Sequence, residues 1–188
     1  MRHTLALIAF VPALALAQGR PDPAAAIATQ AEAMKVFAAM DGVWRGPAWT
    51  LLPNGDKRVI TQTERIGPFL GGSVKMIEGR GYESDGRVGF NALGIISYSA
   101  ATKSYSLRSY ALGYAGDFKF EPTADGYAWE TPGGPGATIK YVATIRDGTL
   151  REVGDRVTAD RPPLRIFEME LKRIGDSSWP AGDAVPMK

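Results

Sequence analysis

The feature that most constrains the fold of this sequence is a succession of ten short strand-like runs, each separated from the next by a turn signal. Asn-Gly and Asp-Gly pairs are typical of tight hairpins, because both turn positions need positive φ. Such pairs occur at 54–55, 85–86, 125–126 and 147–148. The runs are 43–52, 58–66, 73–82, 88–98, 104–112, 117–121, 127–131, 138–146, 150–157 and 164–174. Their short connections predict an up-and-down antiparallel meander.

Several runs alternate between apolar and polar side chains, most clearly 164–174. Phe167, Met169 and Leu171 share one face of this run, and Glu168 and Glu170 share the other. This alternation is typical of antiparallel strands with one covered face. An open meander of this length would leave two unpaired edges, and closure into a barrel removes them. The predicted fold is therefore all-β, an up-and-down antiparallel β-barrel of about ten strands.

One helix is expected before the barrel. Asp22 is a suitable N-cap and Pro23 suits the first helical position. Ile27, Ala31 and Met34 recur at helical spacing, so one stripe of the helix is apolar. We expect this helix to extend to about residue 40 and to pack on the barrel.

The N-terminus has the pattern of a secretory signal peptide. Arg2 and His3 supply positive charge, residues 4–16 are mostly apolar, and Ala15-Leu16-Ala17 predicts cleavage before Gln18. The apolar stretch is shorter than the roughly 20 residues that a transmembrane helix needs. The expected division is a signal peptide at 1–17, a spacer and helix at 18–40, a barrel at 41–175 and a tail at 176–188. We therefore expect a periplasmic or secreted protein.

The chain contains no cysteine, and its one histidine, His3, lies in the predicted leader. The mature protein therefore lacks the residues of Ser-His-Asp and Cys-His catalysis and of Cys/His zinc sites. Carboxylate, lysine, tyrosine and arginine chemistry remains, and no calcium-loop motif is present. We predict no cofactor and no metal site.

The charge pattern argues against two classes of partner. The chain has 22 basic and 20 acidic residues, without a basic cluster that would follow a phosphate backbone. Lys119, Glu121 and Lys140 fall on the presumed outer face, where charge facing lipid at mid-depth is costly. We therefore predict neither nucleic-acid binding nor insertion in a membrane.

A helix that leads into Asp41-Gly42-Val43-Trp44-Arg45-Gly46, followed by a ten-strand meander, resembles the calycin superfamily. The pattern is most similar to lipocalin-like domains of unknown function in exported bacterial proteins. The resemblance implies that Trp44 closes the barrel floor and packs against an arginine of the last strand, for which Arg173 is the candidate. Two departures are the missing lipocalin disulfide and the missing histidine with which nitrobindin-like barrels hold haem.

Two groups of residues are candidates for ligand binding. Glu78 and Arg80 share parity with Met76, so they are expected to point inward. There they would form a polar cluster with Arg108, Glu152 or Arg156. The other interpretation is a solvated face or a structural ion pair. The second group is aromatic and would line the cavity, or would simply fill the barrel. Its members are Tyr98, Tyr105, Tyr110, Tyr114, Phe118, Phe120, Tyr127, Trp129 and Tyr141.

Three hypotheses of function follow. The first is an exported barrel that binds a small hydrophobic or amphipathic molecule in its cavity. The second is a histidine-free enzyme, an isomerase or hydratase, that uses a carboxylate–arginine pair inside the barrel. The third is a filled barrel that acts as a structural or interaction module. The sequence leaves the oligomeric state open.

Overall fold

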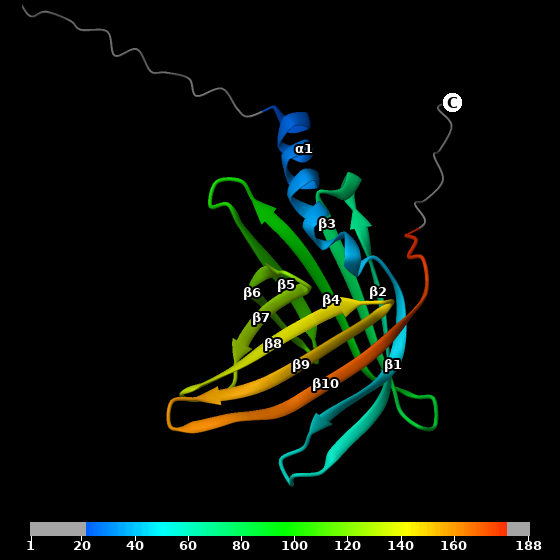
Figure 1. The fold of residues 1–188 in the computed structure, drawn as a ribbon, viewed down its shortest axis with the longest axis vertical. Coiled ribbons are helices and arrows are strands. Elements are labelled where there is room, and N and C mark those ends of the chain that lie inside the picture. The colour runs from blue at the N-terminus through cyan, green and yellow to red at the C-terminus, as the bar shows by residue number, and fades with distance from the viewer. Residues whose placement is uncertain (1–21, 180–188) are drawn as a thin grey trace, which may run out of the picture.

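The computed structural model describes residues 22–179, which form a closed antiparallel barrel preceded by a helix (Figure 1). The predicted fold class is confirmed. The predicted leader and residues 180–188 lie outside the described residues. The helical segments are α1 Pro23–Met34, η1 Lys35–Met40 and η2 Leu70–Gly72. The strands are β1 Gly42–Leu51, β2 Lys57–Phe69, β3 Val74–Tyr82, β4 Val88–Ser99, β5 Ser104–Ala111, β6 Tyr114–Thr123, β7 Gly126–Pro132, β8 Ala137–Arg146, β9 Thr149–Thr158 and β10 Arg161–Gly175.

The topology is the up-and-down meander that the turn signals predict. Each strand pairs with the next along the chain, and β1 pairs with β10 to close the barrel. In that closing ladder, Trp44 lies opposite Arg173 and Ala48 lies opposite Met169. Closure leaves no free sheet edge, which the unpaired ends of an open meander would expose.

The helix begins as predicted but changes form before it ends. The Asp22 side chain accepts a hydrogen bond from the backbone N–H of Ala24 (3.1 Å). α1 stops at Met34, and Lys35–Met40 continue as a 3₁₀ segment in which Phe37 departs from helical backbone angles. The three-residue repeat of a 3₁₀ turn brings Phe37 and Met40 to the same side. Both side chains are 1% exposed.

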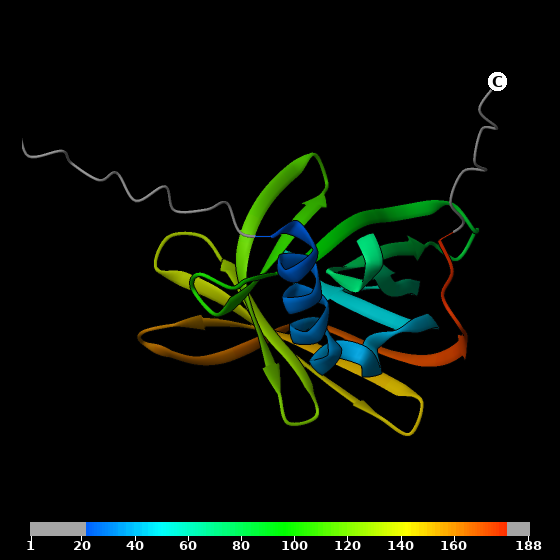
Figure 2. The same ribbon diagram turned by 90° about the horizontal axis from the view of Figure 1, so that it is seen from above.

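This helical segment covers one end of the barrel, as Figure 2 shows from above. Phe37 and Met40 pack there with Trp44, whose indole N–H donates to the carbonyl of Met40 (2.9 Å). Beside them, the ammonium of Lys75 pairs with the carboxylate of Asp41. We call this covered end the floor. The opposite end, where the β1–β2, β3–β4, β5–β6, β7–β8 and β9–β10 hairpins turn, is called the mouth.

Three strand boundaries differ from the expectation by three residues. β10 begins at Arg161, before the expected start at 164, because Arg161 still pairs with Thr158 of β9. β2 continues through Pro68, where a turn was expected, because Pro68 still pairs in register with Lys75 of β3. β6 begins at Tyr114, three residues earlier than expected. The β5–β6 connection is a two-residue turn in which Leu112 and Gly113 both have positive φ (53° and 81°). Leucine rarely adopts this conformation, so the sequence carried no clear turn signal there.

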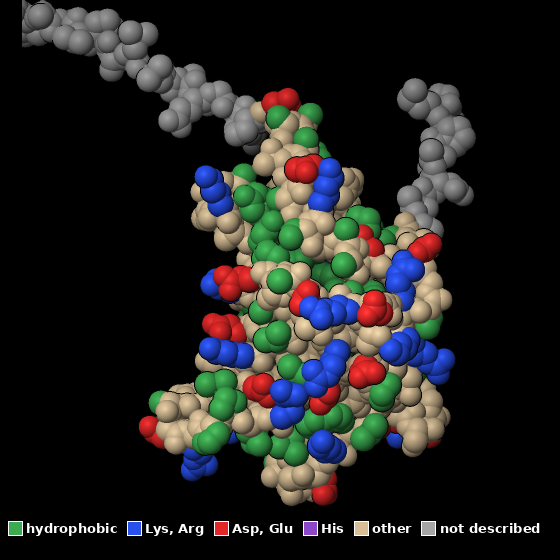
Figure 3. Space-filling model, in the orientation of Figure 1, with side chains coloured by type: hydrophobic (Ala, Val, Ile, Leu, Met, Phe, Trp, Pro, Cys, Tyr) green, Lys and Arg blue, Asp and Glu red, His purple; other side chains and the backbone are tan. Residues whose placement is uncertain are grey.

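The face of the molecule shown in Figure 3 carries interspersed charges of both signs. Arg151 of β9 pairs with Glu168 of β10 (2.6 Å), and Arg165 pairs with Asp155 (2.5 Å). Such exposed cross-strand pairs each contribute little to stability. Across residues 22–179, no helix is both long and apolar enough to cross a membrane.

We expect Trp44→Ala to destabilise the protein far more than Trp49→Ala. Trp44 is 1% exposed and donates a hydrogen bond at the floor, so truncation should lower the free energy of unfolding by about 3–5 kcal/mol. Trp49 is only partly buried and lies under the ammonium of Lys57, so its truncation should cost about 1 kcal/mol. Urea unfolding followed by circular dichroism measures both values. Equal losses would contradict the role given to the floor.

Candidate functional site

Two carboxyl groups lie inside the barrel, directly on the mouth side of the floor. Glu64 of β2 is 8% exposed and Glu152 of β9 is 6% exposed. On each strand the neighbouring inward residue toward the floor is apolar and buried, Ile66 on β2 and Leu150 on β9. We call Glu64 and Glu152 the acid pair.

Glu64 fits between strands because its neighbour on β3 has no side chain. Gly79 lies opposite Glu64 in the β2–β3 register. A Cβ atom at Gly79 would lie only 2.9 Å from Oε1 of Glu64, so no larger residue fits there without a shift. The amide of Gln62, 4% exposed, donates to the same Oε1 atom (2.7 Å). The other oxygen, Oε2, is buried and accepts no hydrogen bond from any residue in 22–179.

Glu152 has more partners than Glu64. It lies opposite Ala143 of β8 and Met169 of β10. Burial raises the pKa of its carboxyl to about 7, while hydrogen bonds from Tyr127 and Trp129 act in the opposite direction by favouring the charged form.

Glu64 holds its proton more tightly still. Burial is the largest cause and raises its pKa to about 8, against the hydrogen bond from Gln62, which lowers it. The negative charges of Glu152 and of Glu78, which lies on the outer wall, raise it further. Near neutral pH the interior can therefore accept or release a proton at two carboxyl groups.

Toward the mouth from the acid pair, four aromatic rings follow one another around the inner wall. Phe118 and Trp129 are 5.9 Å apart between ring centroids, Trp129 and Tyr141 are stacked at 4.2 Å, and Tyr141 and Phe167 are 5.9 Å apart. We call these four residues the aromatic wall. All four are only partly buried although they face inward. At Gly154 a Cβ atom would lie 2.7 Å from Tyr141, so this glycine makes room for the ring.

Phe118, Trp129 and Tyr141 of the aromatic wall were predicted from the sequence. Two other predicted aromatics do not line the interior, since Tyr110 lies on the outer wall and Tyr114 is 80% exposed. The rest lie at the floor. Phe120 is 1% exposed and contacts Phe37 of η1 (5.2 Å between ring centroids). Tyr105 contacts the same ring (5.0 Å), and its hydroxyl donates to the carbonyl of Ala33 (2.9 Å). Tyr98 packs on Tyr105. These three residues attach the helix to the barrel.

The expected inward orientation of Glu78, Arg80 and Arg108 is wrong. Glu78 lies on the outer wall, where it accepts from Arg65 (2.6 Å) and Arg80 (2.6 Å). Arg108 pairs with the carboxylate of Asp117, also outside. The inward positions of β3 are instead 75, 77, 79 and 81, which alternate with the half-buried outer residues. Three of these inward positions are a lysine and two glycines, so the apolar pattern of the sequence does not show which side of β3 faces the interior.

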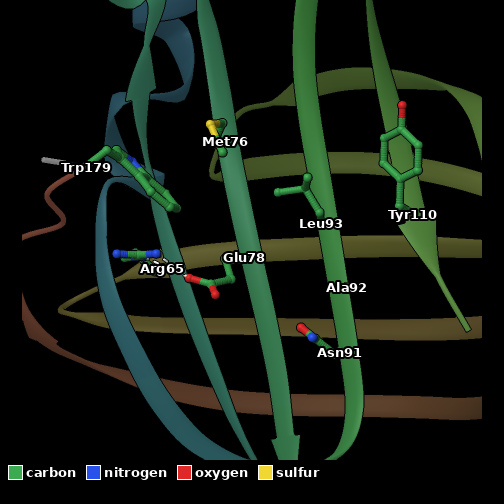
Figure 4. Close-up of a pocket in the computed structure, with 8 residues that line it drawn as sticks. All are labelled: Arg65, Met76, Glu78, Asn91, Ala92, Leu93, Tyr110 and Trp179. Atoms are coloured by element: carbon green, nitrogen blue, oxygen red, sulfur yellow. Dashed lines mark hydrogen bonds and ion pairs between the residues drawn. The ribbon is translucent and has the colours of Figure 1, made fainter. Parts of the chain in front are cut away.

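The outer residues line a shallow depression of about 400 Å³, shown in Figure 4. The ring of Trp179 lies 3.9 Å from the guanidinium of Arg65, which is also paired with Glu78. Partial burial would raise the pKa of Glu78, but hydrogen bonds from Arg65 and Arg80 lower it overall. The depression therefore contains charges that already compensate one another. Its lining is Arg65, Met76, Glu78, Asn91, Ala92, Leu93, Tyr110 and Trp179.

The two residues expected to close the barrel both contact the segment that joins η1 to β1. Trp44 donates to the carbonyl of Met40, and Arg173 donates through Nε to the carbonyl of Asp41 (3.2 Å). Arg173 also pairs with Asp176 (2.5 Å) and has a side chain that is 40% exposed. Trp44 is thus in the floor, whereas Arg173 lies at its rim.

Sequence reasoning missed Gln62 and Glu64, although a signal for them exists. Both share parity with Ile60 and Ile66, so two polar residues continue an apolar face of β2. Glu152 was considered only as a partner of Glu78. Within residues 22–179, no three acidic, histidine or cysteine side chains gather in a way that could hold a metal ion.

Comparison with known proteins bears on the fold alone. No family model matches this sequence, and no curated protein matches it either. The structure is similar to the crystal structure of Rv2717c from M. tuberculosis, with a TM-score of 0.57 and 12% sequence identity. The match covers 76% of this chain and 97% of the other.

We expect the stability of the protein to fall as the pH rises from about 5 to about 8. The pKa values of Glu64 and Glu152 are raised to about 8 and about 7 in the folded state, from 4.5, so the unfolded chain releases these protons first. Stability is greatest below the unfolded value and declines by up to about 1.4 kcal/mol per pH unit for each group.

Urea unfolding at half-unit pH steps measures this decline. Glu64→Gln and Glu152→Gln should each flatten the curve above pH 5, because an amide has no proton to lose. Glu168→Gln is the matched control on the outer wall and should leave the slope in this range unchanged, because Glu168 is not among the charges acting on Glu64. A flat wild-type curve between pH 5 and 8 would contradict the burial of the acid pair.

Proposed function

We propose that the protein binds a small, largely apolar molecule inside the barrel, between the acid pair and the mouth. The proposal includes export of the protein, which rests on the predicted leader at residues 1–17. The barrel is covered at the floor, so a ligand would enter at the mouth. Its apolar part would contact the aromatic wall.

The observation that carries this proposal is the exposure of the aromatic wall. Phe120, at the floor, is 1% exposed, whereas Phe118, Trp129 and Phe167 remain partly exposed although they face inward. Apolar surface that faces inward and still meets solvent is a usual property of ligand sites. Polar groups at one end of an apolar site fix a ligand's orientation, and the acid pair supplies them here.

A second candidate function is acid–base catalysis in the same interior. Carboxyl groups with pKa values of about 7 and about 8 are near the range in which a general acid or base is most effective. The carboxylate–arginine pair first considered for this role, Glu78 with Arg80, lies on the outer wall. An enzyme built on this barrel would use Glu64 and Glu152 instead. Mass spectrometry of a bound molecule before and after incubation separates the two, since a binding protein returns it unchanged.

Titration with the neutral fluorophore N-phenyl-1-naphthylamine tests the binding function. We expect saturable fluorescence enhancement with one site per chain. Trp129→Ala should weaken binding about tenfold, because it removes a stacked ring from the aromatic wall. Tyr110→Ala is the matched control, since Tyr110 lies on the outer wall beside the depression.

Two outcomes would count against the proposal. If neither this fluorophore nor other lipophilic probes bind saturably, the barrel is filled and acts as a structural or interaction module. If Tyr110→Ala weakens binding while Trp129→Ala does not, the fluorophore occupies the outer depression instead of the interior.

A further inference from the structure

We infer that the ligand of this barrel is an amphipathic amine, whose ammonium group pairs with Glu64 and whose apolar body contacts the aromatic wall. The inference rests on the proposed function and adds the chemical class of the ligand.

Glu64 presents an acceptor that nothing in the described chain satisfies. Gln62 donates to Oε1, but Oε2 is buried and has no donor among residues 22–179. Buried polar side-chain atoms in native proteins nearly always have a partner, and an unpaired one is costly. Over the same residues, the one other buried side-chain atom in this condition is Nε1 of Trp179, on the outer wall. When Glu64 is ionised, the interior therefore lacks a hydrogen-bond donor at one defined atom.

The missing donor is best supplied with a positive charge. Among residues 22–179, no lysine or arginine forms an ion pair with Glu64 or Glu152, although eleven other acidic residues form such pairs. Lys75, which is inward and buried, is paired with Asp41 at the floor. A buried carboxylate is stable only when it is paired or protonated. An ammonium group would replace the bound proton of Glu64 and form an ion pair with the resulting carboxylate.

The surroundings of Glu64 favour a cation over an anion. Glu152 on β9 and Glu78 on β3 both act on Glu64 as negative charges. Burial is the main cause of the raised pKa of the Tyr127 hydroxyl on β7, and the negative charges of Glu152 and Glu64 raise it further. This hydroxyl therefore stays neutral. Trp129 and Tyr141, next toward the mouth, offer ring faces that attract ammonium groups. A ligand carboxylate would instead add a third negative charge to the interior.

The arrangement also predicts how pH acts on binding. Between pH 6 and 8.5 the acid pair loses its protons, while an alkylammonium group, with a pKa near that of lysine at about 10.4, keeps its own. Amine affinity should therefore rise over this range. At pH 7 the ammonium group takes the place of the proton on Glu64, so amine binding should release a proton to the buffer.

Displacement of N-phenyl-1-naphthylamine by three matched ligands tests the inference. Dodecylamine, dodecanol and dodecanoate share one chain and differ in the head group, and each is used below its micelle concentration. We expect dodecylamine to displace the fluorophore at a concentration at least tenfold lower than dodecanol at pH 8, with dodecanoate weakest. Calorimetry in two buffers of different ionisation enthalpy should show proton release with dodecylamine and none with dodecanol.

Variants locate the preference at Glu64. Glu64→Gln should bring the ratio of amine to alcohol affinity close to one and abolish the proton release. Glu168→Gln removes an outer-wall carboxylate that is not among the charges acting on Glu64, and it should leave the ratio unchanged, which excludes adsorption of amine to the surface. Circular dichroism and urea unfolding establish that each variant is folded.

The outcomes separate the two proposals. If the fluorophore binds and the three head groups compete equally, or if Glu64→Gln keeps the amine preference, the inference is wrong and the binding function stands. If dodecanoate is the strongest competitor, the interior selects anions and the inference is also wrong. If neither the fluorophore nor any of the three ligands binds, the proposed function itself fails.

Discussion

The interior of this barrel depends on the contacts that hold residues 35–41 across its floor. Phe37 and Met40 fill that end, Trp44 donates to the carbonyl of Met40, and Lys75 pairs with Asp41. Without this cover, water would reach the barrel from both ends. The desolvation that dominates the raised pKa values of the acid pair would then be lost. Closing one end therefore sets the electrostatics of the site as well as the stability of the fold.

The acid pair destabilises the folded state. Burying Glu64 with one unpaired oxygen lowers stability, and at neutral pH the proton that it retains reduces that cost. An apolar side chain at position 64 would pack in the core without this loss of stability. Glycine at position 79 shows that a neighbouring strand is shaped to fit this carboxyl group. Costs of this kind are typical of functional sites, where stability is given up for chemistry.

The sequence predicted the architecture well because hairpin turns and strand alternation are local signals. It could not set the phase of β3, where Lys75, Gly79 and Gly81 face inward and the apolar pattern is missing. The site was found in part: three of the four residues of the aromatic wall were named, but Glu64 was not. A buried acid differs from an exposed one only through tertiary contacts, here those with Gln62 and Gly79, which strand alternation alone does not reveal.

Because the floor of the barrel is covered, a small molecule would enter and leave the interior through the mouth. A molecule that pairs with Glu64 must enter with its polar head leading, because the acid pair lies beyond the aromatic wall from the mouth. Its apolar end then stays nearest the mouth and is the first part to leave. If the proposed ligand is handed on, its acceptor would therefore meet the hairpin turns at the mouth and offer an apolar surface there. Loading from water and unloading into an apolar acceptor would be the natural order of events.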